Sequence, residues 1–220
     1  MSDEAFILSS YDKYLFYKKN KNILPLLPTY INKKLLLKSI KKKKMTYPIV
    51  AKPRFGSSSL DMHKIYNNDE LIALKDGIYI FQENLNMIEY GIDIYIDFIS
   101  SDLIDVFMKK KIFMRGGETD KSISIWEDEI YVIIEQFISK MEGIKGPIDI
   151  DIFFIKGKFY VNEINPRFGG GYAHAHWAGL NFINYIIQNM FGKANKVQHR
   201  NVYKKNSLML KHNDFLFKDL

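Results

Sequence analysis

Short apolar runs alternate with segments of helical period along this chain of 220 residues. Apolar runs bounded by Pro, Gly or charged residues predict strands, which we expect at 48–53, 60–66, 78–83, 91–98, 106–114 and in a hairpin at 148–165. Apolar positions three or four residues apart predict helices, which we expect at 10–22, 31–44, 127–141 and 182–191, with a brief helix capped by Asn68 or Asp69. Strands and helices mixed in this order, without an internal repeat, are typical of an α+β fold.

The order of these elements indicates two lobes with a flanking segment at each end. We expect an N-terminal helix and linker at 1–30, a small lobe at 31–85, a large lobe with a metal site at 86–192, and a basic C-terminal tail at 193–220. Ser10 is the expected N-cap of the first helix. The lobes would be hinged near 82–90, and a polar loop at 115–122 would follow a strand of the second lobe.

Composition excludes several classes of protein. Apolar residues make up 47% of the chain and aromatic residues 15%, which is enough for a packed core rather than a disordered chain. The absence of cysteine excludes disulfides, zinc–thiolate sites and thiol nucleophiles. The first residues carry acids where a signal peptide carries bases, and no apolar run approaches the ~20 residues of a membrane helix. We therefore expect a soluble, cytoplasmic protein without a membrane partner.

The formal charge of +7 comes from one segment. Seven lysines lie between Lys33 and Lys44, with no acid among them. A solvated helix end and loop is the favoured interpretation, and contact with a nucleic acid or a membrane surface is the alternative, since clustered lysines attract phosphates. No recognition motif or aromatic platform stands beside the run, so a nucleic-acid partner is not expected.

Carboxylates and a carboxamide stand at the ends of the two strands of the hairpin at 148–165. Asp151 and Glu163 are twelve residues apart, with a turn-forming Lys-Gly-Lys between them. Glu163 and Asn165 are separated by two, so they share one face of their strand. Two carboxylates in otherwise apolar strands need a cation to offset their repulsion, and hard oxygen ligands suit magnesium. We expect these three residues to hold the metal, with Asp149, which shares the parity of Asp151, as the competing ligand.

Further residues have the chemistry for binding a nucleotide. Arg167 shares the parity of the metal ligands and adds a cation beyond Pro166. Lys52 ends a strand before the polar loop at 54–59, where it could reach phosphates or extend to water. The hinge sequence Gln82-Glu83-Asn84-Leu85 could present groups to an adenine edge, with Glu89 placed for ribose hydroxyls. His174 and His176 lack a third zinc ligand and are interpreted as polar loop residues that could contact substrate.

The order of these motifs resembles the ATP-grasp superfamily, most of all its carbamoyl-phosphate-synthase-like branch, which includes many carboxylate–amine ligases. The resemblance is carried by Lys52-Pro-Arg-Phe-Gly-Ser-Ser-Ser, Phe81-Gln-Glu, Glu89-Tyr-Gly-Ile-Asp, Gly146-Pro-Ile-Asp-Ile-Asp and Glu163-Ile-Asn-Pro-Arg-Phe-Gly-Gly-Gly. It extends from Asp12-Lys13-Tyr14 to the helix that ends near Phe191. A two-lobed fold with the nucleotide site between the lobes is what this resemblance implies.

The resemblance also implies a role for each matching residue, with ATP and Mg²⁺ (or Mn²⁺) as cofactors. Lys52 would contact the α- and β-phosphates beneath a lid that includes Ser57 and Ser58. Gln82, Glu83 and Leu85 would line the adenine pocket, and Glu89 would hold the ribose. One or two metal ions would be held by Asp151, Glu163 and Asn165. Arg167 would stabilise the γ-phosphate or an acyl-phosphate, and Arg115 would reach the same phosphates or the carboxylate.

The implied activity is that of an ATP-dependent ligase, which activates a small-molecule carboxylate as an acyl-phosphate for attack by an amine or similar nucleophile. Members of the family usually carry an α/β domain before the Asp-Lys-Tyr helix, and only about ten residues precede that helix here. The alternative expectation is therefore an ATP-binding subunit or domain that is completed by a partner chain and has no catalysis of its own.

Overall fold

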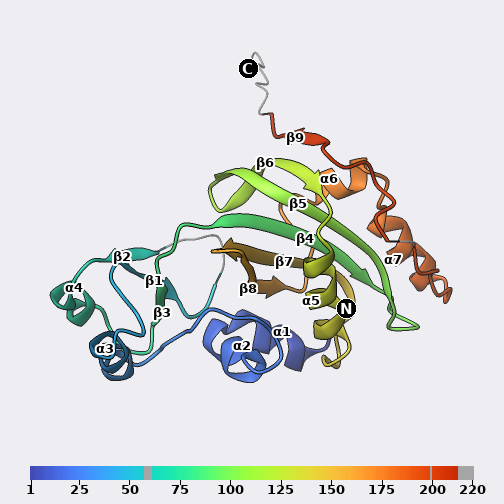
Figure 1. Cartoon of the computed structure of the whole chain (residues 1–220). Coiled ribbons are helices and arrows are strands. Elements are labelled where there is room, and N and C mark those ends of the chain that lie inside the picture. Colours follow the sequence, from blue (N-terminus) through green and yellow to red (C-terminus); the bar gives the residue numbers. More distant parts are fainter. Residues whose placement is uncertain (57–60, 199, 213–220) are drawn as a thin grey trace, which may run out of the picture.

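The computed structural model describes residues 1–56, 61–198 and 200–212, which form two β-sheets with helices packed around them (Figure 1). A three-stranded sheet has the order β2-β1-β3, and a six-stranded sheet has the order β8-β7-β4-β5-β6-β9. All strand pairs are antiparallel. The expected α+β fold is thus confirmed. No helix in the described ranges is both long and apolar enough to cross a membrane.

The small lobe is a sheet covered by two helices. Its strands are β1 (Ile49–Pro53), β2 (His63–Ile65) and β3 (Tyr79–Glu83), and its helices are α3 (Lys33–Lys41) and α4 (Asn68–Ala73). Leu36 and Leu71 of the helices are fully buried against Ile49 and Phe81 of the sheet. The N-cap of α4 is Asn67, whose side chain accepts from the Glu70 N–H, so the expected cap at 68 or 69 was wrong by one or two residues.

In the large lobe the six-stranded sheet has helices on both of its faces. Its strands are β4 (Ile88–Ile96), β5 (Leu103–Arg115), β6 (Glu118–Ile125), β7 (Gly146–Ile155), β8 (Lys158–Asn165) and β9 (Leu208–Leu210). Its helices are α5 (Asp128–Ile138), α6 (Tyr172–Trp177) and α7 (Phe182–Met190). α5 and the N-terminal helices bury the apolar face of the sheet. α6 and α7 pack on a second cluster that includes Tyr95 and Phe107, and this arrangement leaves part of the opposite face polar.

The N-terminal segment forms two helices, not the single helix expected at 10–22. α1 (Glu4–Tyr11) ends and α2 (Lys13–Asn20) begins at Asp12, whose backbone is extended and whose carboxylate accepts from two N–H groups of α2. Ser10 was wrongly expected as an N-cap, because its hydroxyl donates to the Phe6 carbonyl inside α1. The capping residues are Asp3 and Asp12.

The segment after α2 connects the two lobes. The Val161 N–H of β8 donates to the Pro25 carbonyl at 2.8 Å, and Tyr30 exchanges both backbone hydrogen bonds with Phe81 of β3. Residues 25–30 therefore bind to one edge strand of each sheet. We call this segment the strap.

One further expectation needs correction. The expected polar loop at 115–122 is mostly strand, because only Gly116 and Gly117 form the turn between β5 and β6. Both glycines have positive φ, the backbone conformation that glycine adopts most easily. Beyond α7, Tyr203 is buried beside Phe107, and β9 pairs with β6, so part of the segment from 193 packs on the large sheet.

Candidate functional site

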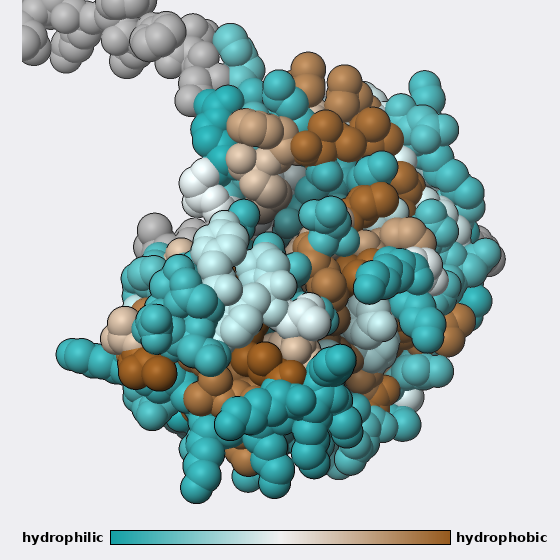
Figure 2. Space-filling view, turned by 60° about the vertical axis from the view of Figure 1, so that its left-hand side comes forward, coloured by the Kyte–Doolittle hydropathy of each residue, from teal (hydrophilic) through white to brown (hydrophobic). Residues whose placement is uncertain are grey.

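A cavity of about 700 Å³ lies between the two sheets. Its walls come from β1 and β3, from the hinge between β3 and β4, and from β7 and β8. Figure 2 shows a hollow in this face of the molecule, between its upper and lower parts. Among the residues expected to bind the nucleotide or the metal, this cavity is lined by Lys52, Gln82, Glu83, Glu89, Asp151 and Glu163.

The polar face of the large sheet presents its side chains in rows, because neighbouring strands are in register. One row contains Asp151 of β7 opposite Glu163 of β8, with Gly91 of β4 on the other side of Asp151. The next row contains Asp149 opposite Asn165. The expected hairpin thus brings together all the acids and the carboxamide that the sequence singled out.

The donor set around Asp151 and Glu163 fits magnesium. In the described residues no three His, Asp or Glu side chains form a group that could hold a metal. The possible oxygen donors are the facing carboxylates of Asp151 and Glu163 and the side-chain amide of Asn165. The Asn165 Nδ2 atom lies 3.3 Å from the Glu163 Oε1 atom. Mg²⁺ is usually held by one or two carboxylates together with phosphate oxygens and water, so this small all-oxygen set suits it.

Two lysines of β5 complete the polar face, and the sequence analysis did not select them. Lys111 donates to Asp151 at 2.6 Å and to Glu89 at 2.8 Å. Burial lowers its pKa, but the charges of Asp151 and Glu89 outweigh this and raise the pKa above its ordinary value. Lys109 forms a buried ion pair with Asp93. Lys109 and Lys111 are two positions apart, so the sequence could have shown that they share one face of β5. Only the pairing of β4 with β5 shows that these lysines reach the acids.

Gly91 makes room for both lysines. A Cβ atom built at this position would lie 3.0 Å from the Lys109 Cε atom and 3.1 Å from the Lys111 Cε atom. The two side chains therefore cross over Gly91 on their way to the carboxylates. The Glu-Tyr-Gly-Ile-Asp motif did not by itself show that a side chain at position 91 would be too close to these two lysines.

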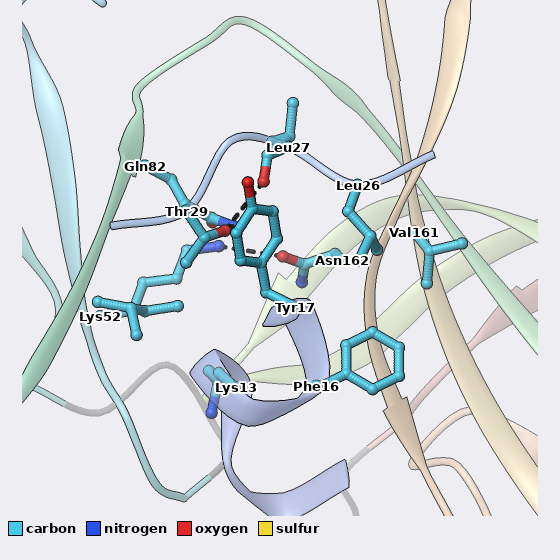
Figure 3. A pocket seen from close by; sticks show the side chains of 11 residues that line it. Lys13, Phe16, Tyr17, Leu26, Leu27, Thr29, Lys52, Gln82, Val161 and Asn162 are labelled. Atoms are coloured by element: carbon cyan, nitrogen blue, oxygen red, sulfur yellow. Dashed lines mark hydrogen bonds between the residues drawn. The ribbon is translucent and has the colours of Figure 1, made fainter. Parts of the chain in front are cut away.

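Lys52 of β1 and Lys13 of α2 both line the cleft between the two sheets, and Figure 3 shows both side chains. Lys52 donates to the Asn162 Oδ1 atom at 3.1 Å, and burial lowers its pKa to about 8, although the charge of Glu163 acts in the other direction. Lys13 of α2 donates to the Gly56 carbonyl, and burial also lowers its pKa. Buried cations whose hydrogen bonds go to neutral oxygens favour an incoming anion. Lys13 was not selected as a site residue, because the sequence does not show that α2 lies against the cleft.

The hinge contains an unsatisfied acceptor. Gln82 is 7% exposed, and its amide nitrogen donates to the hydroxyl of Thr29 in the strap at 2.9 Å (Figure 3). Its Oε1 atom is buried and has no partner among the described residues. Unpaired buried acceptors are costly, so this atom favours a ligand that brings an N–H group. Glu83 accepts from the Thr46 hydroxyl at 2.8 Å. Leu85 packs against the cluster of Leu27, Phe153 and Ile155 and is not among the residues that line the cavity.

A second cavity of about 280 Å³ adjoins the first and shares Asp151, Glu163, Met114 and Gly117 with it. Its other walls include Lys111, Glu118, Asp149 and Arg167. The Arg167 Nη1 atom donates to the Asp149 carboxylate at 3.2 Å. Burial and the nearby charges of Asp151 and Asp93 raise the pKa of Asp149 to about 7.

The three glycines after Phe168 pass close to these side chains. A Cβ atom at Gly169 would lie 2.6 Å from the Asp149 Oδ1 atom, and one at Gly171 would lie 2.8 Å from the Lys109 Cε atom. The glycine run therefore lets the chain cross the polar face of the sheet at short range. The run of three glycines is conspicuous in the sequence, but the sequence does not identify the side chains that it accommodates.

The remaining expected residues lie further from the shared acids or outside the described ranges. Arg115 is at the end of β5, is half exposed, and lies 3.3 Å from Asp120, away from the lining of both cavities. Ser57 and Ser58 lie outside the described residues. His174 was expected in a polar loop, and this was wrong. It is buried in α6 between the hydroxyls of Ser122 and Ser207, and burial lowers its pKa to about 4.

Comparison with known proteins agrees with this geometry. Residues 10–171, which are 162 of the 220, match the sequence profile of a family described as an ATP-grasp domain. A D-alanine–D-alanine ligase from Petrotoga mobilis is 29% identical over 216 residues, covering 86% of this chain and 70% of the ligase.

Two solved structures share the fold. One is a biotin carboxylase complex from Campylobacter jejuni, with a TM-score of 0.73, 17% identity, and coverage of 91% of this chain and 50% of the carboxylase. The other is an N5-carboxyaminoimidazole ribonucleotide synthetase from Thermotoga maritima, with a TM-score of 0.67, 18% identity, and coverage of 88% and 52%. The chain spans about half the length of these two proteins. On the family match and the shared fold, this chain belongs to the ATP-grasp family.

Proposed function

We propose that the protein is a magnesium- and ATP-dependent ligase that activates a carboxylate as an acyl-phosphate for attack by an amine. One observation supports this most directly. Two cavities of different size meet at Asp151 and Glu163, so a nucleotide in the larger one would place its terminal phosphate beside a small molecule in the other. The ligase and synthetase named above support the same reaction class by similarity.

The larger cavity suits ATP. Lys52 and Lys13 supply positive charge for the phosphates, and the orphaned Gln82 Oε1 atom is available to accept a hydrogen bond from the adenine amino group. Guanine has a carbonyl oxygen at the corresponding position, and this would leave two acceptors facing each other. Glu89 lines the same cavity and has a carboxylate that can accept from ribose hydroxyls.

Asp151, Glu163 and Asn165 are the residues that would hold magnesium. When bound there, the metal supplies positive charge that offsets the phosphate charges. Lys111 already pairs with Asp151, so the protein itself brings one cation to the junction of the two cavities. Arg167 adds a second cation on the side of the smaller cavity.

The proposed reaction has two steps. A carboxylate oxygen attacks the γ-phosphorus of ATP, and the bond to the bridging oxygen breaks so that ADP leaves with the electron pair. An amine nitrogen then attacks the acyl carbon, the carbon–oxygen bond to phosphate breaks, and the amine loses its proton to solvent. This chemistry requires no protein nucleophile, so Lys52, Lys111 and Arg167 would act by positioning the reactants and stabilising the developing charge.

A carboxylate screen tests the proposal. ADP release is measured with Mg-ATP and a panel of carboxylates, with hydroxylamine present to trap any acyl-phosphate as a hydroxamate. The proposal predicts that ADP and hydroxamate appear together, and only with certain carboxylates. The alternative of a nucleotide-binding subunit predicts that Mg-ATP binds but that no carboxylate releases ADP. Failure to bind Mg-ATP would contradict both.

A further inference from the structure

The strap is held against β3 by a pair of backbone hydrogen bonds. The Tyr30 N–H donates to the Phe81 carbonyl at 3.0 Å, and the Phe81 N–H donates to the Tyr30 carbonyl at 2.7 Å. This antiparallel bridge places Thr29, the residue before Tyr30, opposite Gln82, the residue after Phe81. Thr29 and Gln82 are 6% and 7% exposed. Thr29 is therefore buried against the hinge, although 53 positions of sequence separate it from Gln82.

The single hydrogen of the Thr29 hydroxyl is already used within the strap. The hydroxyl donates to the Leu27 carbonyl at 2.9 Å, and a carbonyl oxygen can only accept (Figure 3). The hydroxyl oxygen is left as an acceptor, and the Gln82 amide nitrogen donates to it at 2.9 Å. If the amide were turned over, its Oε1 atom would face an oxygen that has no hydrogen to offer, which is unfavourable in a buried place. Thr29 thus fixes the orientation of the Gln82 amide.

The other end of the Gln82 amide has no partner in the described part of the chain. Its Oε1 atom is buried and unpaired, and Gln82 lines the cavity that the proposed function gives to ATP. Because the amide nitrogen is held by Thr29, this end can only accept a hydrogen bond. A purine with an amino group at its 6-position supplies the missing donor, whereas a purine with a carbonyl oxygen there places two acceptors face to face.

We propose that Thr29 is a positioning residue that sets the base selectivity of the site, by holding the Gln82 amide in the orientation that accepts from a 6-amino purine. This inference rests on the proposed function and adds a residue of the strap to it. Thr29 is not among the residues that line the larger cavity, so it acts through Gln82. Without the threonine hydroxyl, neither end of the amide has a fixed partner at position 29. The amide is then free to turn its nitrogen toward a carbonyl oxygen of the ligand.

The test compares ATP with inosine triphosphate (ITP) by calorimetric titration in the presence of Mg²⁺. ITP has a carbonyl oxygen in place of the 6-amino group, and the neighbouring ring nitrogen carries a hydrogen. We expect the wild type to bind ATP at least roughly tenfold more tightly than ITP. Thr29→Val keeps the shape of the side chain and removes the hydroxyl. This variant should lower the ratio of ATP affinity to ITP affinity by about fivefold or more, because its amide can donate to ITP.

Two control variants separate positioning of Gln82 from general support of the strap. Thr29→Ser keeps the hydroxyl and should keep the wild-type ratio. Tyr30→Phe removes a hydroxyl that lies 2.8 Å from the Ser39 hydroxyl, so it weakens the strap without touching the bond between Thr29 and Gln82, and it should also keep the ratio. If Thr29 only supported the strap, Thr29→Val would weaken ATP and ITP binding alike and leave the ratio unchanged.

A double-mutant cycle tests whether Thr29 acts through Gln82. Gln82→Met removes the amide, so Thr29→Val should no longer change the ratio in that background. An equal change of the ratio with and without the amide would show that Thr29 reaches the base by another route, and this would overturn the inference.

The outcomes separate this inference from the proposed function. A wild type that does not bind Mg-ATP contradicts the nucleotide site itself. If Mg-ATP binds, only the inference about Thr29 is overturned when the wild type binds ITP as tightly as ATP, or when Thr29→Val keeps the wild-type ratio. Thermal melting checks that each variant is folded. Thr29→Ala also lacks the hydroxyl and carries the same prediction, so a folding defect in Thr29→Val does not remove the test.

Discussion

Replacing Lys52 by methionine should stabilise the ligand-free protein and weaken nucleotide binding at the same time. Burial lowers the pKa of Lys52 from 10.5 to about 8, so at neutral pH the folded chain holds a charge in an unfavourable environment. Methionine has a similar length and no charge. A residue retained at a cost to stability is expected to serve binding, which is what the cleft position of Lys52 indicates.

The magnitude follows from the pKa. The difference between a pKa of 10.5 and one of about 8 corresponds to about 3.5 kcal/mol, which is an upper bound because the side chain keeps some contact with solvent. Losing the hydrogen bond to Asn162 removes about 1 kcal/mol of stability. The net gain of about 2 kcal/mol should raise the melting midpoint by roughly 4–8 °C for a chain of this size.

The effect has a defined pH dependence. Because the folded-state pKa is below the ordinary value, the unfolded chain binds the Lys52 proton more tightly. The wild type therefore gains stability as the pH rises from about 8 to 10.5, and the advantage of Lys52→Met should shrink over that window. Urea unfolding at pH 7, 9 and 10.5 measures this difference.

Nucleotide binding should respond in the opposite direction. Loss of a charged hydrogen bond to phosphate costs about 1.5–3 kcal/mol, which is roughly a 10- to 150-fold loss of Mg-ATP affinity by calorimetry. Lys158→Met, which replaces an exposed lysine of β8 that lines neither cavity, is the matched control for the stability measurement. A less stable Lys52→Met variant with unchanged Mg-ATP affinity would refute the reasoning.

Three other substitutions test the surroundings of the site. Gly91→Ala should displace the two lysines that cross it, with a loss of about 1–3 kcal/mol in unfolding free energy and at least tenfold weaker Mg-ATP binding by calorimetry. Gly169→Ala should cost a similar ~1–3 kcal/mol in urea unfolding, because its Cβ would meet two carboxylates; full stability would show that the loop can relax. Asp12→Asn removes the ion pair to Arg54 and should cost about 1 kcal/mol at pH 7. Burial raises the pKa of Asp12, but the bonds from Arg54 and from α2 hold it below its ordinary value of 3.8, so the difference from wild type should vanish as the pH falls below that value.

The hairpin of β7 and β8 was the most predictable part of the site. Strand parity placed Glu163 and Asn165 on one face, and this needs only local geometry, since the side-chain period of a strand is fixed at two. The register that starts at the turn would pair Glu163 with Ile150, but a β-bulge between Asp151 and Ile152 shifts it, so that Glu163 faces Asp151. The sequence did not reveal this bulge. The α+β fold was confirmed, because most of the expected elements formed within a few residues of their predicted ends.

The sequence could not show contacts that depend on how distant strands and helices meet. Lys111 reaches Asp151 across 40 positions of sequence, and Lys13 reaches the cleft only because α2 packs beside it. Asp12 interrupts the first helix because its carboxylate serves as a cap and as the partner of Arg54, a role that helical periodicity does not reveal. His174 looked like a loop residue because its neighbours are glycines, yet tertiary packing buries it.

The most direct test of the central claim is calorimetric titration of ATP with and without Mg²⁺, on the wild type and on Asp151→Asn and Glu163→Gln. These carboxylates border both cavities, so the account predicts magnesium-dependent binding to the wild type and at least tenfold weaker binding to each variant. The control Glu142→Gln, at an exposed position, should bind as the wild type does. Equal ATP binding by all four proteins, or ATP binding that does not depend on magnesium, would contradict this assignment of the metal ligands.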